Sequence, residues 1–327
     1  MNAIIRSISA YAPPRRVSNE ELSKTMETSD EWIFSHTGIR YRHIAAEDEA
    51  ASDLAVPAAR QALERAGVKP EEVELILFAT CTADYNGFPS CACLLQDKIG
   101  AVNAGALDIA AACTGFIYGL ETAKNYILSG SYKTILVVAG EVMTKVINWQ
   151  DRNTCVLFGD GAGAALVTPG DGDNRGILSA VLGAEGKSAE VLKRPAGGTR
   201  TPYREGKVKE EDFYLYMDGK PVYNFAVRTI TEVIDKLLQR NSLTIEDIAY
   251  VVPHQANVRI IQAAAKREKI PLEKFYLNMD EYANTSAASI PLALNEMFEK
   301  HLIRPNDLVI TVGFGGGLTY GGNLIRF

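Results

Sequence analysis

The chain has 327 residues, a length that predicts two domain-sized units. Its hydrophobic fraction of 47% and charged fraction of 23% are those of a folded globular protein with a proper core. The net charge of -6 excludes broad nucleic-acid binding, which needs a surplus of Lys and Arg. A local basic patch that meets an acidic partner remains compatible with this charge.

The cysteines and the N-terminal segment indicate a cytoplasmic protein. Five cysteines are an odd number without the spacing of a small disulfide-bonded scaffold, so we expect reduced thiols. Residues 1–14 hold only a short apolar run before two prolines, which is unlike a signal peptide. No apolar run of transmembrane length follows.

Helical and apolar patterns alternate along the first half, which predicts an α/β fold. Ser52 and Asp53 are expected to cap the first helix, which ends at Gly67. In chain order the patterns predict a helix over 52–67, a strand over 73–81, a helix over 88–100, a strand over 106–112, a helix over 113–130, a strand over 134–140 and a glycine-rich turn with a strand over 159–168.

The second half follows the same order, so we expect two duplicated halves, 1–170 and 171–327, joined at the turn-rich segment 171–176. The polar segment 193–212 is expected to be a long excursion or a lid. The predicted elements are a helix over 221–240, a strand over 248–252, a helix over 257–268, a strand over 274–278, a helix over 286–302 with a bend or late start at Pro291, and a strand–turn–strand over 308–327.

Overlaying the halves brings three reactive side chains to one place. Cys113 in the N-terminal half and Asn284 in the C-terminal half both begin the helix after the second strand. His254 follows the first strand of the C-terminal half. Ligand sites of α/β sheets gather at the carboxyl ends of strands, so the two halves would bring these residues together.

Cys113 is the cysteine whose position suits a nucleophile. It stands at a strand-to-helix turn among small residues, where free amides and the helix dipole favour the thiolate, although a cysteine at a helix start can also be inert. The other four cysteines are interpreted as structural: Cys81, Cys91, Cys93 and Cys155. No His, Cys or carboxylate cluster has metal-site spacing, so neither a metal nor a cofactor is predicted.

Histidines are few, which makes selection among them feasible. His254 follows an apolar strand and Pro253, a placement that suits a fixed imidazole at the mouth of a site. His301 is interpreted as a solvated helix end, whereas His36 and His43 lie in a basic region and could contact an anionic ligand. Taken alone, Asn284 would be a turn or N-cap residue, and its equivalence to Cys113 favours a functional role.

The glycine-rich segments are not nucleotide-binding motifs. Segment 314–322 lacks the Lys and Ser/Thr of a phosphate loop, and in 159–163 a strand rather than a helix follows the glycines. We expect these glycines to let backbone amides approach a substrate oxygen.

Together these residues resemble the β-ketoacyl-[acyl-carrier-protein] synthase III family of the thiolase superfamily. The resemblance implies a homodimer with the five-layered α-β-α-β-α thiolase fold. It also implies a decarboxylating condensation of an acyl-CoA primer with malonyl-acyl carrier protein, which initiates type II fatty acid synthesis; the coenzyme A thioester is then a substrate. The matching segments, in family order, are WIFSHTGIRYR (32–42), AACTGF (111–116), FGDGAGAA (158–165), PHQANVRI (253–260), YANTSAASIPLAL (282–294) and GFGGGLTYGG (313–322).

Position by position, the resemblance implies that Cys113 accepts the acyl group, while His254 and Asn284 bind the malonyl thioester oxygen. The amide of Gly316 joins that of Cys113 in an oxyanion hole, and Phe314 lies beside the departing carboxylate. Further implied contacts are with coenzyme A (Thr28, Trp32, Thr37, Arg152, Asn257), with the partner subunit's acyl pocket (Phe88) and with the carrier protein (Gln255, Ala256, Asn257, Val258, Arg259).

One residue departs from the family pattern, because His36 stands where members often carry arginine, although Arg40 and Arg42 are close in sequence. Arg259 could form a basic landing surface for the acidic carrier together with Lys266, Arg267 and Lys269, or these residues could be an ordinary charged helix face. The alternative functions are a specialised polyketide or quinolone-type condensing enzyme, a simple Cys-His acyltransferase or hydrolase, and a degenerate acyl-CoA-binding scaffold.

Overall fold

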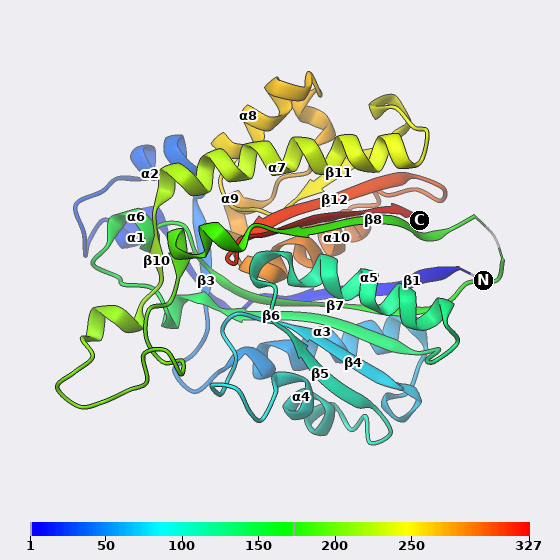
Figure 1. Cartoon of the computed structure of the whole chain (residues 1–327), viewed down its shortest axis with the longest axis horizontal. Coiled ribbons are helices and arrows are strands. Elements are labelled where there is room, and N and C mark those ends of the chain that lie inside the picture. The colour runs from blue at the N-terminus through cyan, green and yellow to red at the C-terminus, as the bar shows by residue number, and fades with distance from the viewer. Residues whose placement is uncertain (1, 173) are drawn as a thin grey trace.

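The computed structural model describes residues 2–172 and 174–327, which form successive layers of helix, sheet, helix, sheet and helix (Figure 1). Within the described residues the first sheet has the order β1-β7-β6-β4-β5 and the second the order β11-β12-β13-β8. The strands of the first are β1 (Ala3–Tyr11), β4 (Leu75–Ala79), β5 (Gly105–Ile109), β6 (Ile135–Val142) and β7 (Asp160–Pro169). Those of the second are β8 (Gly176–Ala184), β11 (Tyr250–Pro253), β12 (Leu308–Gly315) and β13 (Thr319–Arg326).

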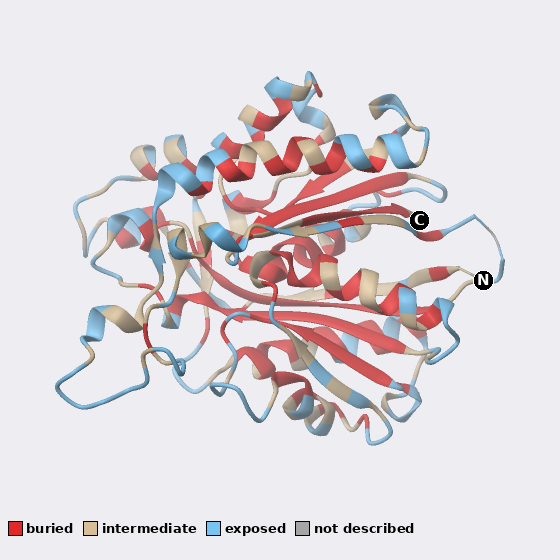
Figure 2. Ribbon diagram, viewed as in Figure 1, coloured by how far each residue is buried: buried red, intermediate tan, exposed pale blue. Residues whose placement is uncertain are grey.

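The first sheet is buried on both faces, which explains why its central strands are mostly apolar. In β4, Leu75, Leu77 and Ala79 face the layer between the sheets, whereas Ile76 and Phe78 pack against the outer helices. Successive side chains of a strand point to opposite faces, so one strand contributes to both cores. Figure 2 shows these strands buried along most of their length.

Three layers of helices cover the sheets. The helices α5 (Gly115–Leu128) and α10 (Ser289–Glu299) lie between them and contribute to the core shared by both. The outer face of the first sheet is covered by α3 (Ala51–Ala66) and α4 (Cys91–Ile99). That of the second is covered by α7 (Gly219–Arg240) and α8 (Val258–Glu268). No helix of the described residues is both long and apolar enough to cross a membrane.

The remaining elements are short. They are β2 (Arg15–Ser18), β3 (Tyr41–Ile44), β9 (Leu192–Lys193), β10 (Tyr216–Met217), α1 (Asn19–Leu22), α2 (Asp30–Thr37), α6 (Arg152–Cys155) and α9 (Met279–Tyr282). Most of them lie on the left of Figure 1, at the carboxyl ends of the parallel strands and away from the two chain termini.

The strand predicted over 274–278 is wrong. Where the first sheet has β5, the second has only an isolated bridge between Val251 and Phe275. The side chain of Gln255 takes the place of a neighbouring strand. Its Nε2 donates to the main-chain carbonyl of Tyr276, and its Oε1 accepts from the main-chain N–H of Asn278. These bonds satisfy backbone groups that a neighbouring strand would otherwise occupy.

Two other expectations need correction. Helix α3 begins at Ala51 rather than at Ser52, and the Asp53 carboxylate accepts a hydrogen bond from the Ala50 amide. Strands β1 and β8, which the sequence patterns did not indicate, complete the two sheets. The division at 170/171 stays a prediction, and position 173 of its turn-rich segment lies outside the described residues.

Candidate active site

The three residues predicted to be catalytic line one cavity of about 850 Å³. Cys113 lies in a 3₁₀ turn between β5 and α5, and His254 directly follows β11. Asn284 precedes the turn that leads into α10. The cavity thus joins the carboxyl ends of strands from both sheets, as the overlay of the halves predicted.

Two backbone amides converge on the sulfur of Cys113. The backbone amides of Cys113 and Gly316 lie beside the thiol, and each lowers its pKa. This approach requires glycine at position 315, where a Cβ atom would lie 2.7 Å from the Cys113 nitrogen. The glycines of 159–163 serve another purpose, because a Cβ on Gly163 would lie 2.5 Å from the Pro291 side chain. Gly161 and Gly163 permit close packing of β7 against α10. None of residues 159–163 is among the described residues that line the cavity, so the expectation that they approach a substrate is wrong.

The amides at this turn favour the Cys113 thiolate as expected, but burial of the sulfur opposes them and has the larger effect. Burial raises the pKa of Cys113 to about 12, and the Glu141 carboxylate adds to the rise, while the hydroxyl of Ser286 opposes it. Helix α5 begins only at Gly115, so Cys113 lies in the turn before it. Desolvation therefore outweighs the favourable amides, and the resting nucleophile is a thiol.

His254 is buried and neutral. Its Nδ1 lies 2.7 Å from the Ser289 hydroxyl, which also accepts from the Gln255 amide. Burial lowers the pKa of His254 to about 3. The Phe314 ring meets the imidazole edge to face, with ring centroids 5.5 Å apart. The imidazole is thus held in place and uncharged throughout the physiological pH range.

Asn284 is fixed through both its side chain and its main chain. Its Oδ1 accepts from the Ser286 amide at 2.9 Å, and its main-chain amide donates to the Leu157 carbonyl. With the oxygen of the carboxamide engaged, its amino group is the end available to a ligand in the cavity.

The patterns missed a polar network behind the nucleophile. The buried carboxylate of Glu141 accepts from the hydroxyls of Ser286 at 2.9 Å and Thr82 at 2.6 Å, and burial raises its pKa. The Cys113 sulfur lies 3.4 Å from the same Ser286 oxygen, which can accept a hydrogen bond from the thiol while its own proton is donated to Glu141. A glutamate at the end of an apolar strand was the available signal.

Cys81 is a further correction. It was interpreted as structural, yet it lines the same cavity as Cys113 and is exposed. Cys91 and Cys155 are buried as predicted, whereas Cys93 is exposed on α4. The cavity therefore holds two thiols.

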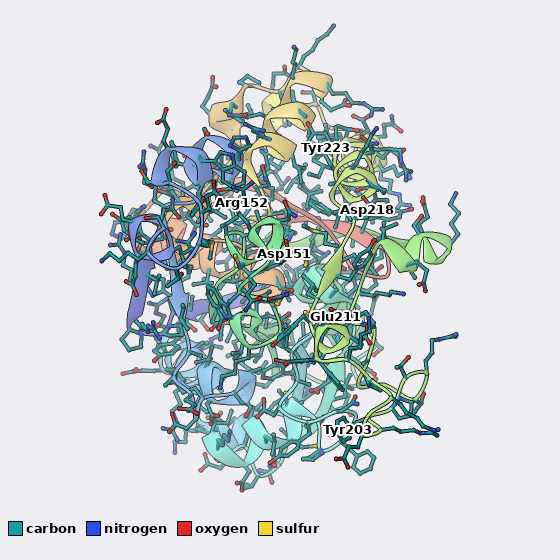
Figure 3. All side chains as sticks on the ribbon, turned by 90° about the vertical axis from the view of Figure 1, so that its left-hand side faces the viewer. Asp151, Arg152, Tyr203, Glu211, Asp218 and Tyr223 are labelled. Atoms are coloured by element: carbon teal, nitrogen blue, oxygen red, sulfur yellow. The ribbon has the colours of Figure 1, made fainter. Side chains whose placement is uncertain are left out.

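Trp32, His36 and Arg152 all line the cavity, and Arg152 is exposed. The Arg152 guanidinium lies 4.7 Å from the centre of the indole, and the His36 ring stacks on Trp32 at 4.5 Å. Figure 3 looks onto this side, with Arg152 on the left and Asp218 and Tyr223, which also line the cavity, on the right. An aromatic ring with a nearby cation suits a planar ligand such as adenine.

Other residues of this region are held by the protein itself. The Thr37 hydroxyl lines the cavity but donates to the Ile33 carbonyl and accepts from the Ile39 amide. Thr28 is not among the described residues that line the cavity. Its buried hydroxyl has no hydrogen-bond partner in the described part of the chain. Arg40 pairs with Asp30, and Arg42 is fully buried, so neither replaces an arginine at position 36.

The segment expected to contact a carrier protein is only partly at the surface. Gln255 and Ala256 are buried, and Val258 packs under Gly38. Asn257 caps α8, and exposed Arg259 lines the cavity at its mouth. Lys266, Arg267 and Lys269 are also exposed. His301 is exposed after α10 as predicted, whereas His43 bonds to the Pro13 carbonyl and faces Glu281 rather than the cavity.

The long excursion is confirmed, and its base forms one wall of the cavity. Strands β9 and β10 pair there, and residues 192–194 and 215–219 line the cavity. The segment between them projects from the lower left of Figure 1, and exposed Tyr203 lies at its far end in Figure 3. Asn86 donates to the Gly197 carbonyl, which ties the excursion to the loop that carries Phe88.

The fold and the cavity together define a condensing enzyme of the thiolase fold. Residues 107–186 match the family model of 3-oxoacyl-[acyl-carrier-protein (ACP)] synthase III, and residues 238–327 match the model of its C-terminal part. The chain belongs to the β-ketoacyl-[acyl-carrier-protein] synthase III family. It is an acyltransferase, and its condensation initiates fatty acid synthesis.

Three comparisons illustrate the similarity. The chain is 47% identical to the β-ketoacyl-[acyl-carrier-protein] synthase III of Caldanaerobacter subterraneus subsp. tengcongensis over 97% of its own length and 96% of the relative's. The crystal structure of the Aquifex aeolicus VF5 3-oxoacyl-[acyl-carrier-protein] synthase III matches with a TM-score of 0.91 and 41% identity, covering 99% of this chain and 100% of that one. The priming β-ketosynthase of the R1128 polyketide pathway also matches, with a TM-score of 0.91 and 35% identity, covering 100% and 96%.

Proposed function

We propose that Cys113 takes the acyl group of an acyl-CoA and that His254 and Asn284 activate a malonyl group carried by acyl carrier protein. The observation that supports this proposal best is the convergence of these three side chains in one cavity, with two amides aimed at the sulfur. A hydrolase or transferase that formed no carbon–carbon bond would need the amides beside the sulfur but not His254 and Asn284 as a second pair of hydrogen-bond donors.

In the first half-reaction the Cys113 sulfur attacks the thioester carbonyl and coenzyme A leaves as its thiol. The amides of Cys113 and Gly316 then stabilise the tetrahedral oxyanion, and each such donor contributes roughly 3 kcal/mol. Because the resting thiol is protonated, its proton must leave as the sulfur attacks. The Ser286 oxygen, 3.4 Å from the sulfur, can accept that proton while its hydroxyl donates to Glu141, which provides a polar route for the proton.

In the second half-reaction malonyl-carrier protein enters and loses carbon dioxide, which leaves an enolate on the thioester. His254 and Asn284 donate hydrogen bonds to the enolate oxygen, and the carbanion attacks the acyl-Cys113 carbonyl. The products are a β-ketoacyl thioester on the carrier and the free thiolate of Cys113. The apolar ring of Phe314 beside His254 disfavours the malonate carboxylate and so assists its departure.

Ser289 positions the imidazole for this role. When its hydroxyl donates to Nδ1, the ring proton lies on Nε2, where it can be donated to the substrate oxygen. We expect Ser289→Ala to slow malonyl decarboxylation about tenfold, the effect of one lost hydrogen bond, with little change in the rate of acylation of Cys113. Single-turnover assays of both half-reactions measure this split.

Ser52→Ala is the matched control, because Ser52 is equally buried but bonds to Asp84 on the other side of the first sheet. Equal slowing of acylation and decarboxylation in Ser289→Ala would show a general loss of structure and contradict the positioning role.

Arg259 is proposed to contact the acidic carrier at the mouth of the cavity. Reversing its charge with Arg259→Glu should raise the KM for malonyl-carrier protein about tenfold and leave kcat within about twofold, because the contact is made equally in ground and transition states. The KM for malonyl presented on coenzyme A should change less. Steady-state kinetics with both malonyl donors measure the difference.

Lys236→Glu provides the control, since Lys236 is exposed on α7 and does not line the cavity. If Arg259→Glu and Lys236→Glu raise the KM for the carrier equally, the effect comes from net charge and the docking contact is refuted.

The working unit is proposed to be a cytoplasmic homodimer. Strand β5 is an unpaired edge of the first sheet in the described chain, and an exposed edge of this kind invites pairing. Phe88 stands 87% exposed on a loop, an unusual position for a phenylalanine unless a partner covers it. In the dimer Phe88 would enter the partner's acyl pocket.

Intact-protein mass spectrometry tests the central proposal. Incubation with a mixture of acyl-CoAs should add one acyl group, which peptide mapping places on Cys113 and whose mass identifies the preferred primer. Addition of malonyl-carrier protein should then release carbon dioxide in step with loss of that group. Acylation without coupled carbon dioxide release would leave a simple acyltransferase and overturn the proposal.

A further inference from the structure

The second thiol in the cavity lies within reach of the nucleophile. The Cys81 sulfur is 3.4 Å from the Ser286 hydroxyl oxygen, and that same oxygen is 3.4 Å from the Cys113 sulfur. One hydroxyl therefore contacts both sulfurs, so their separation cannot exceed the sum of two such contacts.

The backbone brings the two cysteines to the same edge of the first sheet. Cys81 follows β4 and Cys113 follows β5, and these strands pair in parallel with Ala79 opposite Ile109. Ala79 also packs against Gly115, so the chain after Cys113 returns to the end of β4. A disulfide needs Cβ atoms about 4 Å apart, and neighbouring ends of paired strands permit that approach.

Both cysteines can be reached from the cavity. Cys81 is exposed, Cys113 is partly exposed, and both line the cavity that admits substrate. Cys91 and Cys155 are buried, and Cys93 lies on α4 at the outer side of the first sheet. Of the described cysteines, only Cys81 and Cys113 line this cavity.

We propose that Cys81 is a resolving thiol that forms a reversible disulfide with Cys113 when the enzyme meets a peroxide. Hydrogen peroxide oxidises the Cys113 thiol to a sulfenic acid and is itself reduced to water. The Cys81 sulfur then attacks the sulfenic sulfur, the S–S bond forms, and the hydroxyl leaves as a second water with the thiol proton. In sum, two thiols and one peroxide give one disulfide and two waters.

Glu141 assists the second step. Its carboxylate lies 3.4 Å from the Cys81 sulfur and 2.9 Å from the Ser286 hydroxyl oxygen. It can accept the proton of Cys81 as the new bond forms and pass it toward the departing hydroxyl through Ser286. The disulfide would stop condensation, and it would also protect the nucleophile, because a sulfenic acid without a nearby thiol proceeds to irreversible sulfinic acid.

The test compares the wild type with Cys81→Ala and Cys81→Ser, using Cys93→Ser as the control. Each protein is treated with graded hydrogen peroxide, alkylated and mapped by mass spectrometry, and its condensation activity is measured before and after dithiothreitol. Activities are normalised to each untreated protein. In the wild type we expect a cross-linked Cys81–Cys113 peptide two hydrogens lighter than the thiol pair, with activity lost on oxidation and largely restored by the reductant. Cys93→Ser should give the same cross-linked peptide and the same recovery of activity as the wild type.

Both Cys81 variants should lose activity with peroxide and recover severalfold less of it, with sulfinic acid found on Cys113. The serine keeps the size and polarity of the cysteine, so agreement between the variants excludes a packing defect. Prior acylation of Cys113 should prevent the cross-link. Equal recovery in wild type and Cys81 variants, or a wild type without the cross-linked peptide, would overturn the proposal. The mass readout needs no condensation, so this outcome is independent of the proposed catalytic roles.

Discussion

Replacing Cys113 with alanine is expected to leave no acyl group on the protein and to reduce condensation about a thousandfold or more, because the covalent step is lost. Malonyl decarboxylation should persist at a low rate, since it depends on His254 and Asn284 rather than on the sulfur. Cys113→Ser should likewise form no acyl-enzyme, because a hydroxyl in this buried site is even harder to ionise. Intact mass after incubation with acyl-CoA measures the adduct, and carbon dioxide release measures the residual activity.

Cys93→Ser serves as the control for removal of a thiol, since Cys93 is exposed on α4 and is not part of the cavity. A stable acyl adduct that survives in Cys113→Ala would place the nucleophile elsewhere. Transfer of the adduct to Cys81, the other thiol of the cavity, is the specific alternative that peptide mapping would detect.

Replacing His254 with alanine is expected to slow decarboxylation and condensation by about 10² to 10³, the effect of removing one donor to a developing oxyanion. Acylation of Cys113 should continue within severalfold of the wild-type rate, because the oxyanion of that step is held by the amides of Cys113 and Gly316. His254→Asn, which keeps a donor, should retain more activity than His254→Ala. Single-turnover acylation and carbon dioxide release separate the two steps.

The pH dependence gives a second readout for the same role. Because burial lowers the pKa of His254 to about 3, the imidazole stays neutral and able to donate above that pH. The decarboxylation rate of Cys113→Ala should therefore be flat from about pH 5 to about pH 8, where a free histidine would titrate. Acylation should instead become faster as the pH rises. The pKa of Cys113 lies near 12, so the fraction of thiolate increases as the pH approaches that value from below. Loss of acylation alone in His254→Ala would make the histidine the base for the thiol and contradict this division.

Much of the fold follows from local patterns. The alternating elements, the repetition of their order and the placement of Cys113, His254 and Asn284 at strand ends all follow from the amino-acid sequence. The errors have local causes as well. The strand predicted over 134–140 stops one residue short of Glu141, the buried acid at the centre of the missed network. The patterns do not predict strand β1, because Arg6, Ser7 and Ser9 interrupt its apolar run.

Cys113, His254 and Asn284 could be chosen from the sequence because local patterns of neighbouring residues show where each strand ends and each helix begins. The order of these elements along the chain is also part of the sequence. The protonation of Cys113 and the surroundings of Cys81 depend instead on desolvation and on groups distant in the chain. Ser286, which contacts both sulfurs, is 173 positions from Cys113. Burial and such long-range contacts arise only when the two sheets close around the cavity, so the tertiary structure alone reversed the expected pKa shift and brought the second thiol beside the first.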